Sequence, residues 1–242
     1  MNIASNKFKS TIMLLEFRNI KKMYGSMTVL EIENISIDKG ECIGLVGNNG
    51  AGKTTAFSLM LDLIRATEGQ VLTKGHDVSV DETWKKYTSA FIDETFLVDF
   101  LTPNEYFDFV GGLNQWSKAD TDEFLKQFEV FFSGEIIGAR KYIRDLSKGN
   151  QKKVGIIASL IGNPEIVVLD EPFASLDPTS QIRLKKIITD RLDMHTFLIS
   201  SHDLTHVAEV SSRIIILEKG KVVMDNLKTE DTVKKMTEYF AV

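Results

Sequence analysis

Residues 47–54 read GNNGAGKT, which fits the pattern G-x-x-x-x-G-K-[ST]. The segment directly follows the apolar run CIGLV, which has the character of a strand, and directly precedes a stretch with helical character. This strand–loop–helix context distinguishes a phosphate-binding loop from a glycine-rich turn that matches the pattern by accident. The sequence therefore predicts a phosphate-binding loop between a buried strand and a helix.

The residue types in this loop suit the binding of phosphates. Its glycines allow backbone N–H groups to wrap around the phosphates, Lys53 reaches the outer phosphates, and Thr54 offers a hydroxyl to Mg²⁺. We expect the loop and its flanks to contact the ligand: Gly47, Asn48, Asn49, Gly50, Ala51, Gly52, Lys53, Thr54 and Thr55.

A second motif, EIVVLDEP at residues 165–172, reads as a buried parallel strand that ends in a carboxylate. In open α/β sheets such strand ends face the ligand, so Asp170 is expected to hold Mg²⁺, directly or through water. Glu171 is not needed for the metal and could polarise the attacking water in phosphoryl transfer. The alternative is a solvated strand end without a role, which is less favoured beside a complete phosphate loop.

The rest of the chain predicts a mainly parallel sheet with additions. Short strands separated by Tyr24-Gly25 and Lys39-Gly40 fill residues 14–46, and a helix is expected at about 53–65. From residue 163 onward strands alternate with helices, which is typical of a parallel sheet covered on both faces. We expect one domain over residues 14–242, with a helical insertion at about 92–160 and a dispensable segment at 1–12.

Helix starts inside the insertion are marked by capping signals. Thr102 is followed by Pro103 and, three positions after the cap, by Glu105; Ser117 and Asp120 have the same relation. The aromatic residues between 91 and 132 mostly fit a small helical core. Phe96, Leu97 and Phe100 fall before the first of these helices, and we expect at least one of them to be exposed.

Composition restricts the class of protein. The 242 residues are 43% hydrophobic and carry a formal charge of −5, which argues against a nucleic-acid binder with a broad basic surface. The lone cysteine, Cys42, is expected to be a small buried residue, and a reducing cytosol fits its isolation. No apolar run approaches the roughly 20 residues that span a bilayer, so the chain is expected to be soluble by itself, with a membrane partner left open.

Residues 146–153, LSKGNQKK, resemble half of another phosphate site. Ser147 could cap a helix that begins there, Gly149 allows close approach to its backbone, and lysines follow. Helix starts of this kind attract phosphate through free N–H groups and the positive end of the dipole. The residues alone do not say which ligand such a half-site serves.

Taken together, these motifs resemble the ATP-binding subunits of ABC transporters, from about Leu14 to about Val223. LSKGN is similar to the family's signature motif, Ser175-Leu176-Asp177 to its D-loop, and His202 to the switch histidine that contacts the γ-phosphate. Tyr24 matches the aromatic that stacks on adenine, and Glu94 falls where the family usually has the glutamine of the Q-loop.

The resemblance implies a phosphate-loop NTPase (RecA-like) core with an N-terminal antiparallel β subdomain and an inserted α-helical subdomain. It implies ATP and Mg²⁺ as ligands, with Lys53, Glu171 and His202 in catalysis. It also implies contacts from Tyr24, Glu94, Ser147, Gly149 and Asp177 to nucleotide, and metal binding by Thr54, Asp170 and Glu94.

The partners follow from the same resemblance. Two such domains pair head to tail, as identical or sister subunits, so that each signature helix faces the phosphates held by the other subunit. The pair powers an integral membrane permease from the cytoplasmic face. Lys148 and Asn150 replace Gly and Gln of the commonest signature, and together with Glu94 they are similar to the exporter branch that moves antibiotics or lipids.

The sequence is also compatible with other functions. The chain could be a soluble ATPase of the same family that serves a different assembly, such as iron–sulfur cluster biogenesis. A GTPase or small-molecule kinase is less favoured because no guanine-reading motif is visible. His202 and His206 have the i, i+4 spacing of a metal site, but no third ligand accompanies them.

Overall fold

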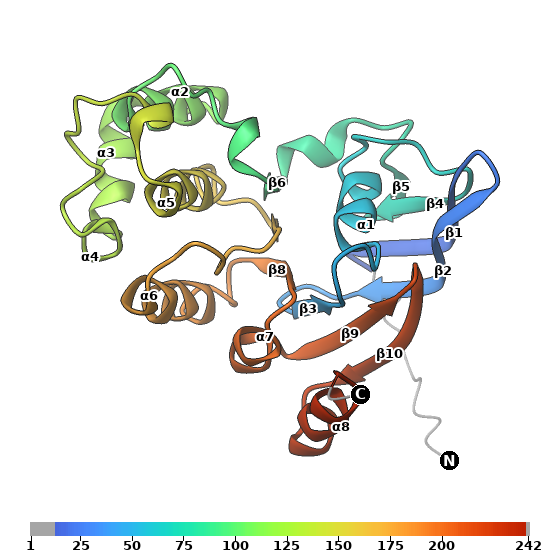
Figure 1. Cartoon of the computed structure of the whole chain (residues 1–242). Helices are drawn as coiled ribbons and strands as arrows, with labels where there is room; N and C mark the ends of the chain where they lie inside the picture. The colour runs from blue at the N-terminus through green and yellow to red at the C-terminus, as the bar shows by residue number, and fades with distance from the viewer. Residues whose placement is uncertain (1–12, 241–242) are drawn as a thin grey trace, which may run out of the picture.

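The computed structural model describes residues 13–240, so the predicted dispensable segment at 1–12 lies outside the described residues. Within them the chain forms one sheet of ten strands in the order β5-β4-β1-β2-β10-β9-β3-β8-β7-β6 (Figure 1). The strands are β1 (Leu15–Tyr24), β2 (Met27–Ile37), β3 (Cys42–Val46), β4 (Glu68–Thr73), β5 (His76–Asp77), β6 (Thr88–Phe91), β7 (Ile166–Leu169), β8 (Thr196–Ser201), β9 (Arg213–Glu218) and β10 (Lys221–Leu227).

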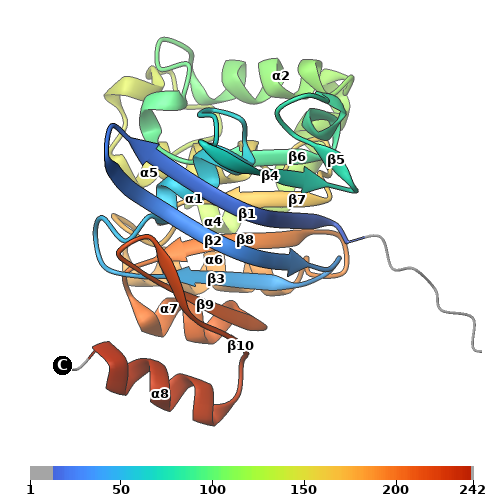
Figure 2. The same cartoon turned by 90° about the vertical axis from the view of Figure 1, so that its right-hand side faces the viewer.

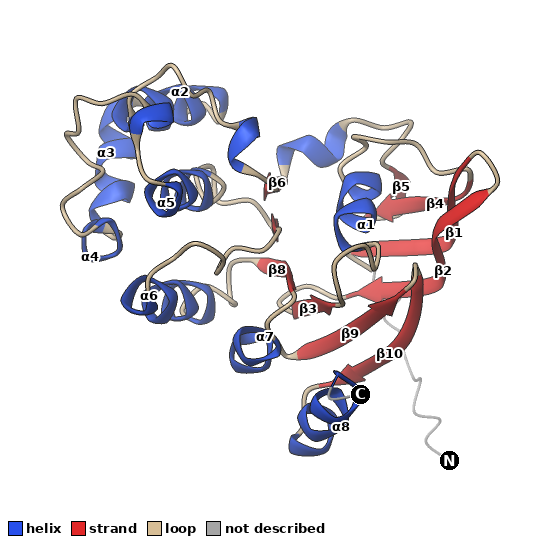
Figure 3. Cartoon of the chain, viewed as in Figure 1, coloured by secondary structure: helices blue, strands red, loops and turns tan. Residues whose placement is uncertain are grey.

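Eight α-helices and three one-turn 3₁₀ helices complete the described part of the chain (Figure 3). The α-helices are α1 (Lys53–Met60), α2 (Pro103–Leu113), α3 (Lys118–Lys126), α4 (Glu129–Phe132), α5 (Lys148–Ala158), α6 (Pro178–Thr189), α7 (Leu204–Val210) and α8 (Glu230–Phe240). The 3₁₀ helices are Thr83–Lys86, Glu94–Phe96 and Ile143–Asp145. None of the helices within residues 13–240 is long and apolar enough to cross a membrane.

Strands β9, β3, β8, β7 and β6 are parallel neighbours and form the core of the sheet. One face of these strands packs in an apolar layer around α1, and the other is covered by α5 and α6 and, beside β3 and β9, by α7 and α8. Because both faces are covered, β3 and β7 are buried at every position, which explains their continuous apolar runs. The loops after β3, β6, β7 and β8 therefore meet at one edge of the sheet.

The N-terminal strands form an antiparallel lobe, as predicted. β1 pairs with β2 and β4 in antiparallel register, and β4 pairs with β5. Within the sheet, this lobe meets the rest through a single parallel pairing of β2 with β10, between Glu31 and Lys221, and β10 in turn pairs antiparallel with β9. The lobe also shares an apolar core with α1 and the parallel strands. Figure 2 shows β1 and β2 crossing in front of the core strands, with α8 below them.

The helical insertion stands to one side of the sheet, drawn in green to yellow in Figure 1. Both predicted helix starts are confirmed, because Thr102 with Glu105 and Ser117 with Asp120 form reciprocal capping boxes. Its core contains fully buried phenylalanines: Phe107, Phe128, Phe131 and Phe132.

The helix expected at about 53–65 is shorter than predicted. α1 ends at Met60, and Asp62 then adopts a left-handed backbone with φ of 51°. The amides of Leu63 and Ile64 both turn back to the carbonyl of Ser58, which closes the helix and starts the loop. The apolar residues after Met60 continue the helical pattern in the sequence, and for this reason the predicted helix was too long.

Candidate nucleotide-binding and catalytic site

The phosphate loop lies between β3 and α1. Gly50 and Gly52 have φ of 81° and 108°, a region that strongly favours glycine. The Lys53 side chain is buried and bends back over the loop, with Nζ 2.7 Å from the carbonyl oxygen of Gly47. The first turn of α1 leaves backbone N–H groups free of intrahelical partners, which is the arrangement that binds phosphate.

Thr54 and Asp170 meet at the sheet edge. The Thr54 hydroxyl donates to Asp170 Oδ2 at 2.6 Å, although the two residues are 116 positions apart. The Ser200 hydroxyl, at the end of β8, donates to the other carboxylate oxygen. A hydroxyl and a carboxylate side by side supply hard oxygen atoms, so these residues fit Mg²⁺.

Glu171 lies between two of the other predicted catalytic residues. Its Oε2 is 2.8 Å from His202 Nδ1, and its Oε1 is 3.5 Å from Lys53 Nζ. The structure thus brings together Lys53, Glu171 and His202, which come from the ends of three neighbouring strands. The Glu171 carboxylate therefore lies beside the phosphate loop.

A cavity of about 330 Å³ lies at this edge of the sheet, beside the phosphate loop. Tyr24, from the antiparallel lobe, lines it opposite the loop, and its side chain is 54% exposed. An aromatic ring with a free face is suited to stacking on a base. The lining consists of Tyr24, Val29, Asn49, Gly50, Ala51, Gly52, Lys53, Thr54, Thr55, Asp170 and Glu171.

Several predicted site residues lie outside this lining: Gly47, Asn48, Glu94, Ser147, Gly149, Asp177 and His202. Ser147 caps α5 by accepting from the amide of Asn150 at 3.3 Å, as its sequence context predicted. A side chain at Gly149 would come within 2.8 Å of the carbonyl of Ser175, so glycine is needed for α5 to lie against this loop. Asp177 caps α6, and hydrogen bonds from Ser180 lower the pKa of its carboxyl.

Glu94 is placed differently from the other predicted metal ligands. It begins the one-turn helix Glu94–Phe96, and its Oε1 lies 3.4 Å from Nζ of Lys152 on α5. It does not line the cavity that contains Thr54 and Asp170. Its predicted contact with the metal therefore remains a prediction, and the contact that the structure gives it is an ion pair.

Two residues that matter here were not singled out from the sequence. Ser200 binds both Asp170 and the amide of Glu171, and its signal was a polar residue at the end of a buried strand. Lys152 is buried and donates to the carbonyl oxygen of Glu171. Lysines are seldom buried, so nothing in the sequence indicated that Lys152 is buried.

The two histidines with i, i+4 spacing face different surroundings. His202 contacts Glu171, whereas the ring of His206 lies 4.7 Å from that of Phe173, with Nε2 3.6 Å from Asp203. Within residues 13–240 no three His, Cys, Asp or Glu side chains form a group that could hold a metal ion.

A phosphate loop, a neighbouring strand that ends in a carboxylate, and a Glu–His pair at the same sheet edge define a phosphate-loop nucleoside triphosphatase. Over residues 30–174 the chain matches the family model described as ABC transporter. The chain therefore belongs to the ABC transporter family, as an ATP-hydrolysing cassette.

Relatives in several organisms agree with this placement. An uncharacterized ABC transporter ATP-binding protein of Methanocaldococcus jannaschii is 34% identical over 92% of this chain and 80% of its own length. Another from Synechocystis is 33% identical over 78% of this chain but 54% of its own length, so the chain spans about half of that relative. The lipopolysaccharide export system ATP-binding protein of Haemophilus influenzae is 28% identical, over 92% of this chain and 96% of the relative.

Solved structures share the fold. An ATP-binding subunit of an ABC transporter superposes with a TM-score of 0.81 at 24% identity, covering 93% of each chain. A dimeric ATP-binding cassette bound to ADP and phosphate superposes with a TM-score of 0.78 at 23% identity, covering 89% of this chain and 99% of the other.

Proposed function

We propose that this chain is the ATP-hydrolysing subunit of an exporter, that it dimerises when it binds ATP, and that it powers a separate membrane permease. The observation that carries the proposal is the Glu171 carboxylate held between Lys53 and His202 at the mouth of a complete phosphate loop. A permease would hold the chain at the cytoplasmic face of the membrane.

The site residues divide the chemistry among them. In the proposed complex Tyr24 stacks on adenine, the loop amides hold the phosphates, and Lys53 exchanges its contact with Gly47 for the outer phosphates. Thr54 and Asp170 hold Mg²⁺, which neutralises phosphate charge when bound. Glu171 accepts a proton from the attacking water, and His202 orients that carboxylate and contacts the γ-phosphate.

The experiment that tests this function is the substitution Glu171→Gln. The amide keeps the size of the side chain but cannot accept the proton, so kcat should fall by about a hundredfold or more while ATP binding is retained. Steady-state ATPase assays and binding of labelled ATP measure the two effects separately. Turnover close to that of the unsubstituted chain would contradict the assignment of Glu171.

Dimerisation is proposed because the signature segment has no nucleotide of its own chain to serve. Ser147 is exposed and caps α5 outside the lining of the nucleotide cavity, which leaves this helix start open to a ligand held by another chain. A second copy or a sister subunit would bring its phosphate loop to Ser147 and Gly149. The dimeric cassette among the solved relatives supports this reading.

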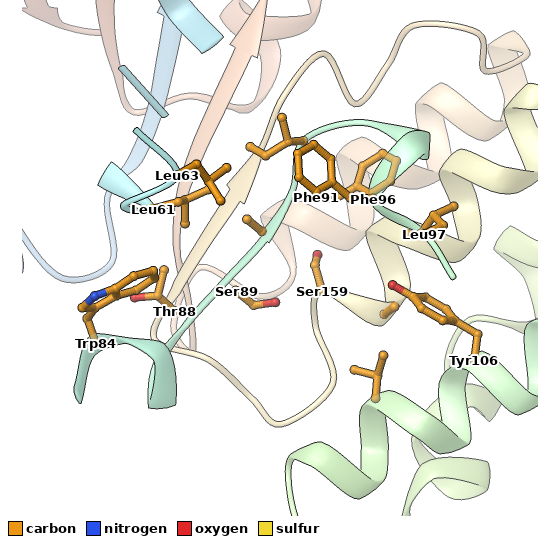
Figure 4. Close-up of a pocket in the computed structure, with 15 residues that line it drawn as sticks. Leu61, Leu63, Trp84, Thr88, Ser89, Phe91, Phe96, Leu97, Tyr106 and Ser159 are labelled. Atoms are coloured by element: carbon orange, nitrogen blue, oxygen red, sulfur yellow. The ribbon is translucent and has the colours of Figure 1, made fainter. Parts of the chain in front are cut away.

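A groove between the core and the helical insertion is suited to bind an apolar segment of a partner protein. It has a volume of about 350 Å³ and is lined by side chains of β6, α2 and α5 and by the segment after β6 (Figure 4). Phe96 lies at the groove and is 61% exposed, as is Phe100, whereas Leu97 is 8% exposed. The prediction that at least one of the three is exposed is confirmed, and we propose that a permease helix covers Phe96.

Export as the direction of transport rests on the signature variant. Lys148 and Asn150 in the signature and Glu94 in the Q-loop position resemble the branch that exports antibiotics and lipids. The relative from Haemophilus influenzae is named for lipopolysaccharide export, and it matches this chain over nearly its whole length.

A further inference from the structure

Two consecutive lysines on α5 are buried but have different surroundings. Lys152 is 7% exposed and Lys153 is 4% exposed. Lys152 Nζ donates to the carbonyl oxygen of Glu171 at 3.0 Å and lies 3.4 Å from Glu94 Oε1. Lys153 Nζ instead lies 5.6 Å from the centre of the Phe131 ring. Only the first of these two ammonium groups reaches the site.

The backbone of Glu171 is held on both sides in a strained conformation. Its φ is 47°, in the left-handed region that residues with a side chain seldom adopt. Its amide donates to the Ser200 hydroxyl at 2.9 Å, and its carbonyl oxygen accepts from Lys152 at 3.0 Å and from the amide of Ala174 at 3.2 Å. A residue in such a conformation keeps it only while its surroundings impose it. Among these contacts, Ser200 and Lys152 supply the two that come from side chains far away in the sequence, on β8 and α5.

Glu94 balances the charge of Lys152. Its side chain is 14% exposed, and burying an ammonium group without a partner is costly. The one-turn helix Glu94–Phe96 thus turns Glu94 inward, toward Lys152, and leaves Phe96 exposed at the groove. The contacts from Glu94 to Lys152 and from Lys152 to Glu171 connect the edge of the helical insertion to the sheet edge.

We propose that Lys152 is a positioning residue for ATP hydrolysis, which holds the Glu171 carbonyl so that the carboxylate stays beside the attacking water. Glu94 in turn holds the Lys152 ammonium group in place. This inference rests on the proposed role of Glu171, and it gives the acidic residue at position 94 a function that glutamine would perform less well.

The test compares kcat and KM of full-length variants. Lys152→Met keeps the length of the side chain but removes the hydrogen bond to Glu171, so kcat should fall by about tenfold while KM changes less than twofold. Lys152→Arg, which can still donate, should restore most of kcat. Lys153→Met is the matched control because it removes an equally buried ammonium group from the same helix; its kcat should stay close to that of the unsubstituted chain.

Glu94 is tested in combination. Glu94→Gln should lower kcat, and the double variant Glu94→Gln/Lys152→Met should be no slower than Lys152→Met alone, because both changes act through one contact. The double variant leaves no unpaired buried charge, so it also serves if Lys152→Met fails to fold.

Three results would overturn the inference: an unchanged kcat in Lys152→Met or in the double variant, an equal loss in Lys153→Met, or no rescue by Lys152→Arg. The Glu171→Gln variant separates this failure from that of the proposed function. If Glu171→Gln stops turnover but Lys152→Met leaves kcat unchanged, the positioning role alone is wrong.

Discussion

The Glu171 carboxylate sits between Lys53 and His202, while Lys53 also contacts the carbonyl of Gly47. These contacts occupy the Lys53 ammonium group that the outer phosphates of a nucleotide need. Arrival of the phosphates would draw Lys53 away from both oxygens, and Glu171 would then keep His202 as its neighbour. If Lys53 moves to the phosphates as proposed, these three residues would rearrange their contacts when nucleotide binds.

Cys42 provides a prediction at the scale of one residue. Burial in β3 raises the pKa of its thiol to about 12, so the thiolate is almost absent at pH 8. We expect the folded chain to react with Ellman's reagent only after it is unfolded in denaturant, and then with one thiol per chain. Rapid reaction of the folded protein at pH 8 would contradict the burial of Cys42.

Lys53, Thr54, Asp170 and Glu171 were predictable because each follows from local chemistry and from its position relative to an apolar strand. His202 was expected from its resemblance to the family's switch histidine, and it contacts Glu171. Lys152 and Ser200 were not predictable, because their roles come from tertiary contacts across the sheet edge. Lysine at 152 looks the same in the sequence whether it is solvated or buried.

Helix α5 shows how one element can depend on a single small residue. Any side chain at Gly155 would overlap the ring of Phe91 in β6, so the absence of a β-carbon lets α5 lie against the strand. The cap at Ser147 was predicted from the sequence. The close approach at Gly155 was not, because it depends on which strand the helix meets.

This contact gives a prediction for a pair of helical glycines. Gly155→Ala should destabilise the fold by about 1–3 kcal/mol, because the overlap with Phe91 outweighs the better helix propensity of alanine. Gly112→Ala in α2 is the control: nothing lies within 4 Å of the added carbon, so stability should rise by up to about 1 kcal/mol. Thermal and urea unfolding measure both. A Gly155→Ala variant as stable as the unsubstituted chain would contradict the packing of α5.

At the scale of the whole molecule, the parallel core and the helical insertion were predictable, since alternating strands and helices and two capping boxes announce them. The single pairing through which β2 joins β10 was not predictable. It links segments about 190 residues apart, and no local pattern sets such a register.

The proposed head-to-tail dimer predicts a crosslink between chains. Asn49→Cys places a thiol on the phosphate loop and Lys148→Cys places one beside the signature serine; both positions are exposed, and Cys42 is buried. Chains that each carry one of these substitutions, mixed in the Glu171→Gln background, should crosslink in the presence of ATP and not without nucleotide. Crosslinking that is equally strong without ATP, or absent with it, would contradict the dimer.

The proposed permease contact predicts a loss of binding without a loss of folding. Phe96→Ser should leave thermal stability and ATP hydrolysis of the chain nearly unchanged, because the ring is 61% exposed, yet it should prevent co-purification with the permease. Phe109→Ser removes another exposed ring, 49% accessible and outside the groove lining, and should retain the partner. Equal retention by both variants would count against the groove as the docking site.

The single residue pair between β2 and β10 bears on how a nucleotide is held. Tyr24 belongs to the antiparallel lobe, while the phosphate loop belongs to the parallel core. A nucleotide bound as proposed contacts the lobe through its base and the core through its phosphates, and so bridges the two. We therefore expect bound ATP to steady the lobe against the core, in addition to the apolar contacts that the two already share.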